Sequence, residues 1–486
     1  MRHKIFGGVA WNAVGLMIDN GLNILVKLIL ARLLLPEHFG IIGFAAIFIG
    51  MVEVFSDLGM SAALIQRKDE KLKPIDYDTA FWAGLVWGLF LFLVLSLIVS
   101  PLAADFFHES MLTSVIPALS VVLLLKPLWA VHVINITREL DFKRIVIPRN
   151  TSKIIAAVVA IIMALTGFGV WSLVFQSVVS ELLLVIIYTY FSPWRPRMRF
   201  SKTSLKNIFG FGVYTTGTQV FNYLTGNVDY LLIGRLLGAG PLGVYTLGYT
   251  VTYIVRAKIM DVINKVFYPV YSKVQDDLST VKRYYFKVIK YNCIVIYPMM
   301  VGIILLAEPG VLIGLGEKWQ DAIIPMQLMA AAGLVHLLTS SNTVLLRGIG
   351  KPQLELIFSI IKTLGVNVPL IVLGVIYYGI IGAAAGLLAA KIVIFFINNL
   401  TLRKVAGIKF TEILANAGSL FAMTFIVSAL SVFISNYIVL GIIFVLYLIV
   451  HIKLSYKDLI QLLDIYKSRK TKVLTIEDSD NEKNVL

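Results

Sequence analysis

Charged and amide side chains interrupt the first long apolar segment of this 486-residue chain, residues 8–32. Asn12, Asp19, Asn23 and Lys27 fall within one narrow sector of a helix that turns by about 100° per residue. A charge at the centre of a bilayer costs about 2.5 to 3.5 kcal/mol on insertion scales, so such groups usually face a bundle interior or a watery cavity. The stripe therefore predicts a cavity lining. The alternative is that Asp19 and Lys27 lock neighbouring helices together.

A second polar stripe lies in the apolar segment 207–236. Its members are Gln219, Asn222, Tyr223, Asp229 and Tyr230. Tyrosine rings stack on sugar faces and amides hydrogen-bond to hydroxyls, so this stripe favours a cavity for a sugar-bearing substrate. The alternative is helix packing through Gly217 and Gly226.

Two carboxylates, Glu53 and Asp57, lie one helical turn apart on one face. Paired carboxylates in a membrane share a proton or bind a cation, because the charge of one opposes ionisation of the other. With Asp261, they are the candidates for coupling to a sodium or proton gradient. We expect no metal site and no other cofactor.

Further ionisable residues lie inside other apolar segments. They are Lys126, Glu181, Arg256, Lys258, Lys265, His336, Lys362 and Lys391. Basic side chains that converge on a cavity at the inner leaflet suit a diphosphate or an anionic sugar, because several cations together offset its desolvation. The alternative for each cation is that it extends to the inner membrane surface. Glu181 is expected to pair with one of the cations.

The elements that carry these residues are membrane helices. The chain is 58% apolar and only 15% charged, which excludes a soluble fold. Apolar segments fall at 8–32, 39–65, 78–101, 112–137, 145–166, 168–192, 207–236, 242–267, 290–313, 323–347, 354–378, 380–402, 412–434 and 437–453. We therefore expect an all-α polytopic membrane protein of about 14 transmembrane helices.

The basic residues predict the orientation of these helices. Most of the 43 Lys and Arg lie before the first segment, after each even-numbered segment and in the tail, whereas the other connections hold little beyond Arg32, Arg235 and Lys318. Because cytoplasmic loops retain Lys and Arg, both termini are expected in the cytoplasm. The net charge of +15 then reflects topology and contact with membrane lipids, and we expect no nucleic-acid partner.

An internal repeat relates the two halves of the chain. Residues 31–40 (ARLLLPEHFG) align with residues 234–243 (GRLLGAGPLG) at an offset of 203, which matches Arg32 to Arg235 and Gly40 to Gly243. Six segments separate the copies, so both copies run in the same direction. We expect an N-lobe at 1–192, an inter-lobe cytoplasmic loop at 193–206, a C-lobe at 207–404, two extra helices at 405–455 and a cytoplasmic tail at 456–486.

The N-terminal quarter resembles a known family. The stretches GVAWN at 8–12, ARLLLPEHFG at 31–40 and FSDLGMSAALIQ at 55–66 are similar to the Wzx-type lipopolysaccharide, colanic acid and teichuronic acid exporters. These are polysaccharide transporters of the multidrug/oligosaccharidyl-lipid/polysaccharide exporter superfamily. The resemblance implies a flippase, and therefore not an enzyme, that moves undecaprenyl-diphosphate-linked oligosaccharide across the bacterial cytoplasmic membrane by alternating access.

The resemblance also implies a cationic cavity lined by the first, second, seventh and eighth helices. The positions that fit are Lys27, Arg32, Arg235, Arg256, Lys258 and Lys265. The last two helices would form a groove for the lipid tail. Implied partners are membrane lipids, the lipid-linked oligosaccharide, and a polysaccharide polymerase with chain-length proteins.

Two alternatives stay open. One is a cation-coupled multidrug exporter of the same superfamily, for which an acidic cavity is expected. The other is a membrane glycosyltransferase or polymerase, for which Asp76 and Asp78 have the spacing of a motif that holds a metal-bound sugar nucleotide. The surplus of intramembrane Lys and Arg argues against the first. The short outer connections argue against the second, because such chemistry usually needs a sizeable outer domain.

Overall fold

The computed structural model describes residues 2–56, 59–67, 72–209, 223, 226–350, 352–434, 436–458 and 460. Within these ranges the regular structure is helical and contains no strand. Nine helical stretches of this part are long and apolar enough to cross a membrane. The expected all-α polytopic membrane fold is confirmed, whereas the number of 14 helices stays a prediction.

The chain divides into two compact units, which we describe separately. Unit 1 consists of Met1–Val251, Gly310–Pro325 and Val368–Gly386, and unit 2 consists of Thr252–Pro309, Met326–Asn367 and Leu387–Leu486. The lobe and tail boundaries expected from the repeat remain predictions.

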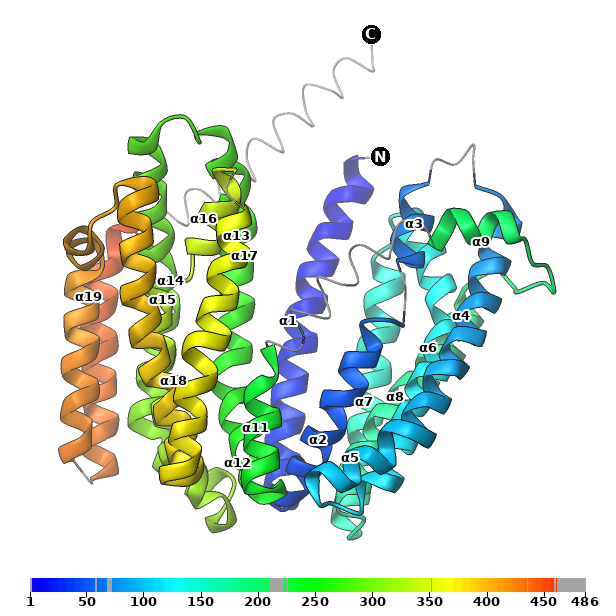
Figure 1. Cartoon of the computed structure of the whole chain (residues 1–486), viewed down its shortest axis with the longest axis horizontal. Coiled ribbons are helices and arrows are strands. Elements are labelled where there is room, and N and C mark those ends of the chain that lie inside the picture. The colour runs from blue at the N-terminus through cyan, green and yellow to red at the C-terminus, as the bar shows by residue number, and fades with distance from the viewer. Residues whose placement is uncertain are drawn as a thin grey trace. The chain divides into compact units, whose positions relative to one another are not determined.

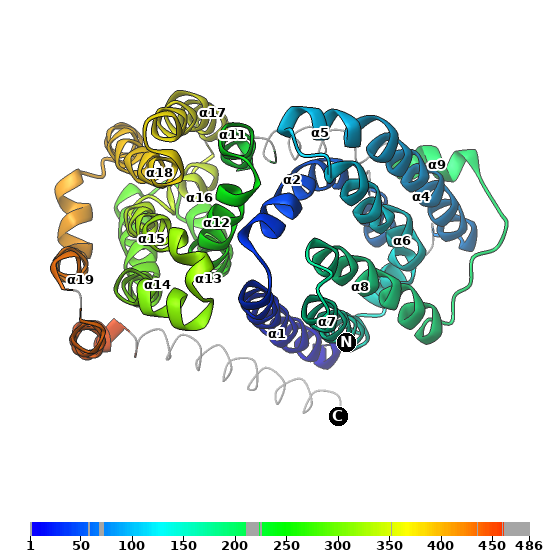
Figure 2. The same cartoon turned by 90° about the horizontal axis from the view of Figure 1, so that it is seen from below.

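Unit 1 holds most of the N-terminal helices (Figures 1 and 2). They are α1 (Arg2–Leu33), α2 (Pro36–Glu53), α3 (Met60–Gln66), α4 (Pro74–Val94), a π-helical turn (Leu95–Val99), α5 (Ser100–Phe107), α6 (Leu112–Arg138), α7 (Lys143–Leu165), α8 (Val170–Phe191), α9 (Lys202–Phe209), α11 (Val228–Leu237) and α12 (Ala239–Tyr249). Helix α7 packs between α1 and α8, and α6 packs against α2, α4 and α8. Figure 2 shows α1, α4, α6, α7 and α8 side by side in one bundle.

Helices α2 and α12 cross with their backbones in direct contact. A Cβ atom on Gly40 would collide with the carbonyl oxygen of Ala239, and a Cβ atom on Gly243 would collide with the carbonyl oxygen of Pro36. Pro36 and Ala239 are separated by the repeat offset of 203, as Gly40 and Gly243 are. Each copy therefore presents its glycine to the same position of the other copy, which is the pattern of a two-fold contact. Small residues allow this approach, and close van der Waals packing is a main source of helix association in a membrane.

The C-terminus of α1 is capped by side chains of the segment that follows α14. The Trp319 indole Nε1 donates to the Ala31 carbonyl at 2.7 Å, and the Lys318 ammonium donates to the Arg32 carbonyl at 2.8 Å. These carbonyls lack partners within their own helix, and a cation at this end also complements the helix dipole. Trp319 is fully buried and meets the Phe39 ring edge-on at 5.4 Å. The turn from α1 into α2 is thereby held in place.

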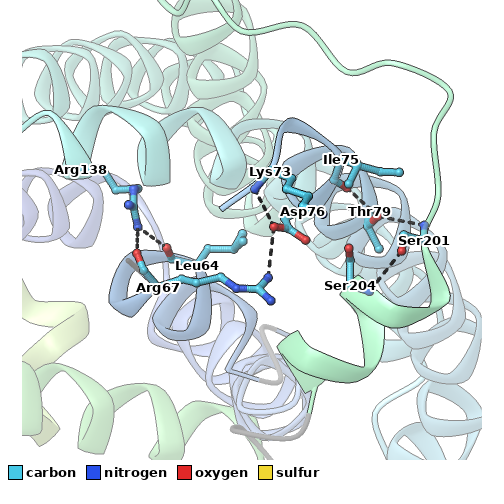
Figure 3. A network of polar contacts seen from close by, with 9 residues as sticks. All are labelled: Leu64, Arg67, Lys73, Ile75, Asp76, Thr79, Arg138, Ser201 and Ser204. Carbon is cyan, nitrogen blue, oxygen red and sulfur yellow. Dashed lines mark hydrogen bonds and ion pairs between the residues drawn. The ribbon is translucent and has the colours of Figure 1, made fainter. Parts of the chain in front are cut away.

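At the opposite end of α2, a polar network fastens α3 to α4 and α6 (Figure 3). The Arg138 guanidinium at the end of α6 donates to the Leu64 and Arg67 carbonyls at 2.6 and 2.8 Å, so it caps the last turn of α3. The Arg67 guanidinium lies 3.1 Å from the Asp76 carboxylate, which also accepts the Lys73 amide at 2.8 Å. Asp76 therefore serves as an ion-pair partner and caps the start of α4.

The segment expected to link the lobes, 193–206, lies on the same end of α4. The Asp78 carboxylate accepts the Arg197 amide at 3.1 Å, and the Thr79 hydroxyl accepts the Ser201 amide at 3.1 Å. The Ser201 hydroxyl in turn accepts the Ser204 amide at 3.3 Å, where α9 begins (Figure 3). The carboxylates of Asp76 and Asp78 are both buried and engaged in these fastening contacts.

Unit 2 holds the C-terminal helices, and α14, α15 and α18 contribute residues to both units. The remaining elements of the described chain are a π-helical turn (Thr250–Ile254), α13 (Val255–Lys273), α14 (Leu278–Gly314), the 3-10 helix Glu317–Ala322, α15 (Ile323–Leu337), α16 (Asn342–Gly348), α17 (Pro352–Ile360), a second π-helical turn (Ile361–Asn367), α18 (Val368–Ala406), α19 (Phe410–Leu430), a 3-10 turn (Ser431–Phe433) and a last helix (Tyr437–Asp458). Asp277 directly precedes α14, and its carboxylate caps the helix by accepting the Ser279 and Thr280 amides. Hydrogen bonds from Thr280 and Ser279 hold the pKa of Asp277 well below its usual range.

Helix α18 is in fact a helical hairpin. The backbone reverses at Tyr378 and Gly379, where Gly379 has a φ of 57° that an L side chain rarely adopts. The two arms then touch through Gly374 and Gly382, since a Cβ atom on either would collide with the carbonyl oxygen of the other. The expected segment boundary between 378 and 380 coincides with this reversal.

We predict that a single methyl group at the α2–α12 crossing destabilises the protein. Gly40→Ala and Gly243→Ala each force two backbones apart, which typically costs about 1–3 kcal/mol. The matched control is Gly240→Ala, which adds the same methyl to α12 where no atom lies within 4 Å. Thermal unfolding of the full chain in detergent measures the difference.

The double variant Gly40→Ala/Gly243→Ala should lose less than the sum of the two single losses, because both methyl groups separate the same helices. Additive losses, or a control as unstable as the test variants, would contradict the direct contact.

Candidate functional site

The first predicted stripe places its acid against a neighbouring helix. The carboxylate of Asp19 forms an ion pair with the Lys153 ammonium from α7. Along the same helix Asn23 is exposed and Lys27 is half-buried. Asn12 belongs to α1, but its side chain lies outside the described part of the structure. The observed pair joins α1 to α7, which is the locking role that we left open for Asp19.

A second charged group connects α2, α6 and α8. The Lys126 ammonium donates to the Glu53 carboxylate at 2.6 Å and to the Ser56 hydroxyl at 3.2 Å. One turn along α6, the Trp129 indole donates to the Glu181 carboxylate at 2.7 Å. Glu53 thus has a cationic partner in this conformation. Asp57, which we expected beside it, lies outside the described residues.

Glu181 lies within electrostatic range of Lys126, Glu53 and Arg149. Arg149 and Lys153 were missed as intramembrane cations, because both were counted with the basic residues of an inner connection. Their position within the apolar segment 145–166 was the available signal.

The second predicted stripe is described in part. Gln219 and Asn222 lie outside the described residues. The Tyr223 hydroxyl donates to the Ala46 carbonyl of α2 at 3.0 Å, and Tyr223 lies within electrostatic range of Glu53. This stripe therefore reaches the face of α2 that carries Glu53.

Asp229 is enclosed by aromatic side chains. Its carboxylate accepts the Tyr245 hydroxyl at 2.8 Å and the Tyr230 amide at 3.0 Å. The Tyr230 ring meets the Tyr245 and Tyr249 rings edge-on, each at 5.5 Å. Asp229 is buried in this cluster, which the sequence reasoning did not identify because Tyr245 lies on the next helix.

Arg32 and Arg235 occupy equivalent places in the repeat. Each is exposed and lies in the last turn of its helix, α1 or α11. The Arg32 guanidinium lies against Gly316, and the Arg235 guanidinium lies 5.3 Å from the Phe106 ring centre. Both arginines therefore lie at helix ends.

Unit 2 brings four predicted basic residues into one neighbourhood. Arg256 of α13 is buried, with its guanidinium 5.4 Å from the Tyr253 ring centre and against Gly333 of α15. His336 follows Gly333 by about one turn and lies within electrostatic range of Arg256. His336 also lies within electrostatic range of Lys362 and Lys391. Four separate segments thus direct basic side chains toward a common region, which suits a polyanionic ligand such as a diphosphate.

The other predicted residues of α13 lie outside this neighbourhood as described. Lys258 and Asp261 are exposed. Lys265 lies on α13, but its side chain is not described. No group of three or more His, Cys, Asp or Glu that could hold a metal ion occurs in the described ranges.

Comparisons with known proteins agree with the sequence resemblance. The chain is 26% identical over 399 residues to the lipopolysaccharide biosynthesis protein WzxC of Escherichia coli K12, covering 81% of this chain and 80% of that one. It is 25% identical over 357 residues to the teichuronic acid biosynthesis protein TuaB of Bacillus subtilis 168, covering 72% of each. Among solved structures, the lipid II flippase MurJ in an inward closed conformation shares the fold, with a TM-score of 0.70 and 16% sequence identity. The match covers 93% of this chain and 100% of that chain.

A family model described as polysaccharide biosynthesis protein matches residues 29–324, which is more than half of the chain. The resemblance to polysaccharide exporters is therefore confirmed, and the chain belongs to this family of polysaccharide biosynthesis proteins.

Proposed function

We propose that this protein is a flippase that moves an undecaprenyl-diphosphate-linked oligosaccharide from the inner to the outer leaflet of the bacterial cytoplasmic membrane. The observation that carries the proposal is the family match over residues 29–324 in a chain with a polytopic membrane fold. Two relatives are named for lipopolysaccharide and teichuronic acid biosynthesis, and a solved structure with the same fold is a lipid II flippase. Such a protein moves its substrate without making or breaking a bond, so it is a transporter and not an enzyme.

The physical task of a flippase explains polar side chains within membrane helices. Sugars and a diphosphate cannot cross hydrocarbon unaided, because each unsatisfied polar or charged group is costly there. A path lined by polar residues supplies the lost hydration, while the lipid tail stays in the bilayer. We assign to this path Asn12, Asn23, Lys27, Gln219, Asn222 and Tyr223. Two six-helix lobes open the path by alternating access.

The charges favour an anionic cargo over a cationic drug. Arg256, His336, Lys362 and Lys391 share one neighbourhood in unit 2, whereas Glu53 and Asp19 in unit 1 have lysine partners. A drug exporter for cations needs an acidic site, which these pairs do not supply. The glycosyltransferase alternative also loses support, because Asp76 and Asp78 are buried in contacts that hold α3, α4 and segment 193–206 together.

Several finer features belong to the same proposal. The protein lies in the cytoplasmic membrane with both termini inside, and it works with a polysaccharide polymerase and chain-length proteins. Transport is coupled to a sodium or proton gradient, with Glu53, Asp57 and Asp261 as the candidate carboxylates. The last two helices, which include α19, form the groove for the lipid tail.

We predict that removal of the unit 2 charges impairs export. Arg256→Ala should reduce surface polysaccharide on the order of tenfold, because it deletes a charge-assisted contact with the diphosphate. Arg256→Lys should retain part of the activity, and Arg32→Ala and Lys258→Ala should also reduce it. The readout is surface polysaccharide in a bacterium whose own exporter is deleted, with membrane levels checked by immunoblot. Normal surface polysaccharide in all three alanine variants would exclude the cationic path, and altered drug susceptibility instead would favour the drug exporter.

We also predict the orientation of the chain. Cys293 is the single cysteine, so Cys293→Ala provides a background for single-cysteine variants. Lys4→Cys and Lys470→Cys should react with a membrane-impermeant maleimide only after the cells are lysed. Ser110→Cys, in an expected outer connection, should react in intact cells. The reverse pattern would contradict the assignment of the termini to the cytoplasm.

A further inference from the structure

The ion pair between Lys126 and Glu53 is open to its surroundings. Glu53 is the last residue of α2, and its side chain is 47% exposed, whereas the Lys126 side chain is 29% exposed. Lysine presents three donors, and the observed bonds go to the Glu53 carboxylate and the Ser56 hydroxyl. A ligand can therefore reach both charges without unfolding a helix. The Asp19 side chain, in the other ion pair described above, is 19% exposed.

Among the described residues, the ionisable groups around this pair are balanced in charge. Lys126 and Arg149 supply two cations, and Glu53 and Glu181 supply two carboxylates. Tyr223 also lies within electrostatic range of Glu53, and its hydroxyl donates to the Ala46 carbonyl. An anionic ligand that binds Lys126 upsets this balance, because it must share the ammonium with a carboxylate. The excess negative charge is removed only if one carboxylate moves away from Lys126 or becomes protonated.

Glu53 is the carboxylate that is free to respond. Glu181 is held by the Trp129 indole at 2.7 Å, which fixes its position against α6. Glu53 has Lys126 as its ion-pair partner and lies at the end of its helix, with its side chain about half exposed. Loss of Lys126 leaves Glu53 as an uncompensated charge in a membrane protein, a state that protonation removes.

We propose that Lys126 is an anion receptor which Glu53 occupies in the absence of substrate. On this inference, which rests on the proposed function, the diphosphate of the lipid-linked substrate displaces Glu53 from Lys126. The released carboxylate then takes up one proton from water, so that substrate binding and proton uptake become one event. The Glu53 carboxylate becomes a carboxylic acid, and no other bond changes.

The competition makes Glu53 and Lys126 variants act in opposite directions. Glu53→Gln removes the competitor, so it should bind a lipid diphosphate more tightly and without proton uptake. Lys126→Met removes the receptor, so it should weaken binding on the order of tenfold, as expected for a lost charge-assisted hydrogen bond. Lys126→Arg keeps the positive charge and should retain proton-linked binding. The double variant Glu53→Gln/Lys126→Met should resemble Lys126→Met.

The measurement is titration calorimetry of the full chain in detergent with farnesyl diphosphate as the probe. Titrations in two buffers of different ionisation enthalpy report the protons taken up on binding. A parallel titration with inorganic diphosphate separates the two sources of the anion. Tighter binding of farnesyl diphosphate assigns the receptor to a lipid-linked group, and equal affinities assign it to the diphosphate alone.

Asp141→Asn is the matched control. Asp141 forms an ion pair with Arg144 of α7 at 3.3 Å, so this variant removes a carboxylate from an ion pair outside the proposed site. It should change neither affinity nor proton uptake. Parallel losses of binding and thermal stability in Glu53→Gln and Lys126→Met would identify a merely structural pair and overturn the inference.

The remaining outcomes separate this inference from the proposed function. If the unaltered chain binds farnesyl diphosphate but Glu53→Gln leaves proton uptake unchanged, the receptor model is wrong and the flippase proposal stands. If the unaltered chain binds neither diphosphate, the receptor model is overturned, whereas the flippase proposal is decided by surface polysaccharide in the deletion strain.

Discussion

The cost of placing a charge in hydrocarbon governs this structure. Each ionisable side chain within a membrane helix needs a counter-charge, a ring, a hydrogen-bond partner or a ligand. The unit 1 pairs Asp19 with Lys153 and Glu53 with Lys126 meet this need with opposite charges. In unit 2, Arg256 lies over a tyrosine ring, and the neighbouring His336 is within electrostatic range of Lys362 and Lys391. Unit 2 also contains ion pairs, among them Lys290 with Asp458 and Arg347 with Glu355.

The same constraint acts on the backbone at helix ends. Terminal carbonyls have no partner within their own helix, and other segments supply the donors. Trp319 and Lys318 donate to carbonyls at the end of α1, and Arg138 donates to a carbonyl at the end of α3. Some basic residues near membrane boundaries thus complete helices, in addition to any role in topology or substrate binding.

Composition and periodicity were enough to predict the membrane fold, because hydropathy acts locally along the chain. The family was indicated separately, by the resemblance of stretches such as ARLLLPEHFG at 31–40. The reversal at Tyr378 and Gly379 was also anticipated as a segment boundary. Partners were not predictable, because Lys153 and Asp19 are 134 residues apart and nothing in one segment specifies which neighbour it packs against. Lys153 itself was assigned to a loop, since a basic residue near an inner boundary has the same pattern in a loop or a helix. The hydrogen bond from Tyr245 to Asp229 was not predictable for the same reason, because the two residues lie on different helices.

The reciprocal approach of Gly40 to Ala239 and of Gly243 to Pro36 has a historical meaning. A surface that fits its own copy is self-complementary, which is the property of a symmetric homodimer. An ancestral half-length protein with this surface would have associated in parallel with a second molecule before gene duplication and fusion joined them. After fusion, the sequences of the two halves would have been able to diverge.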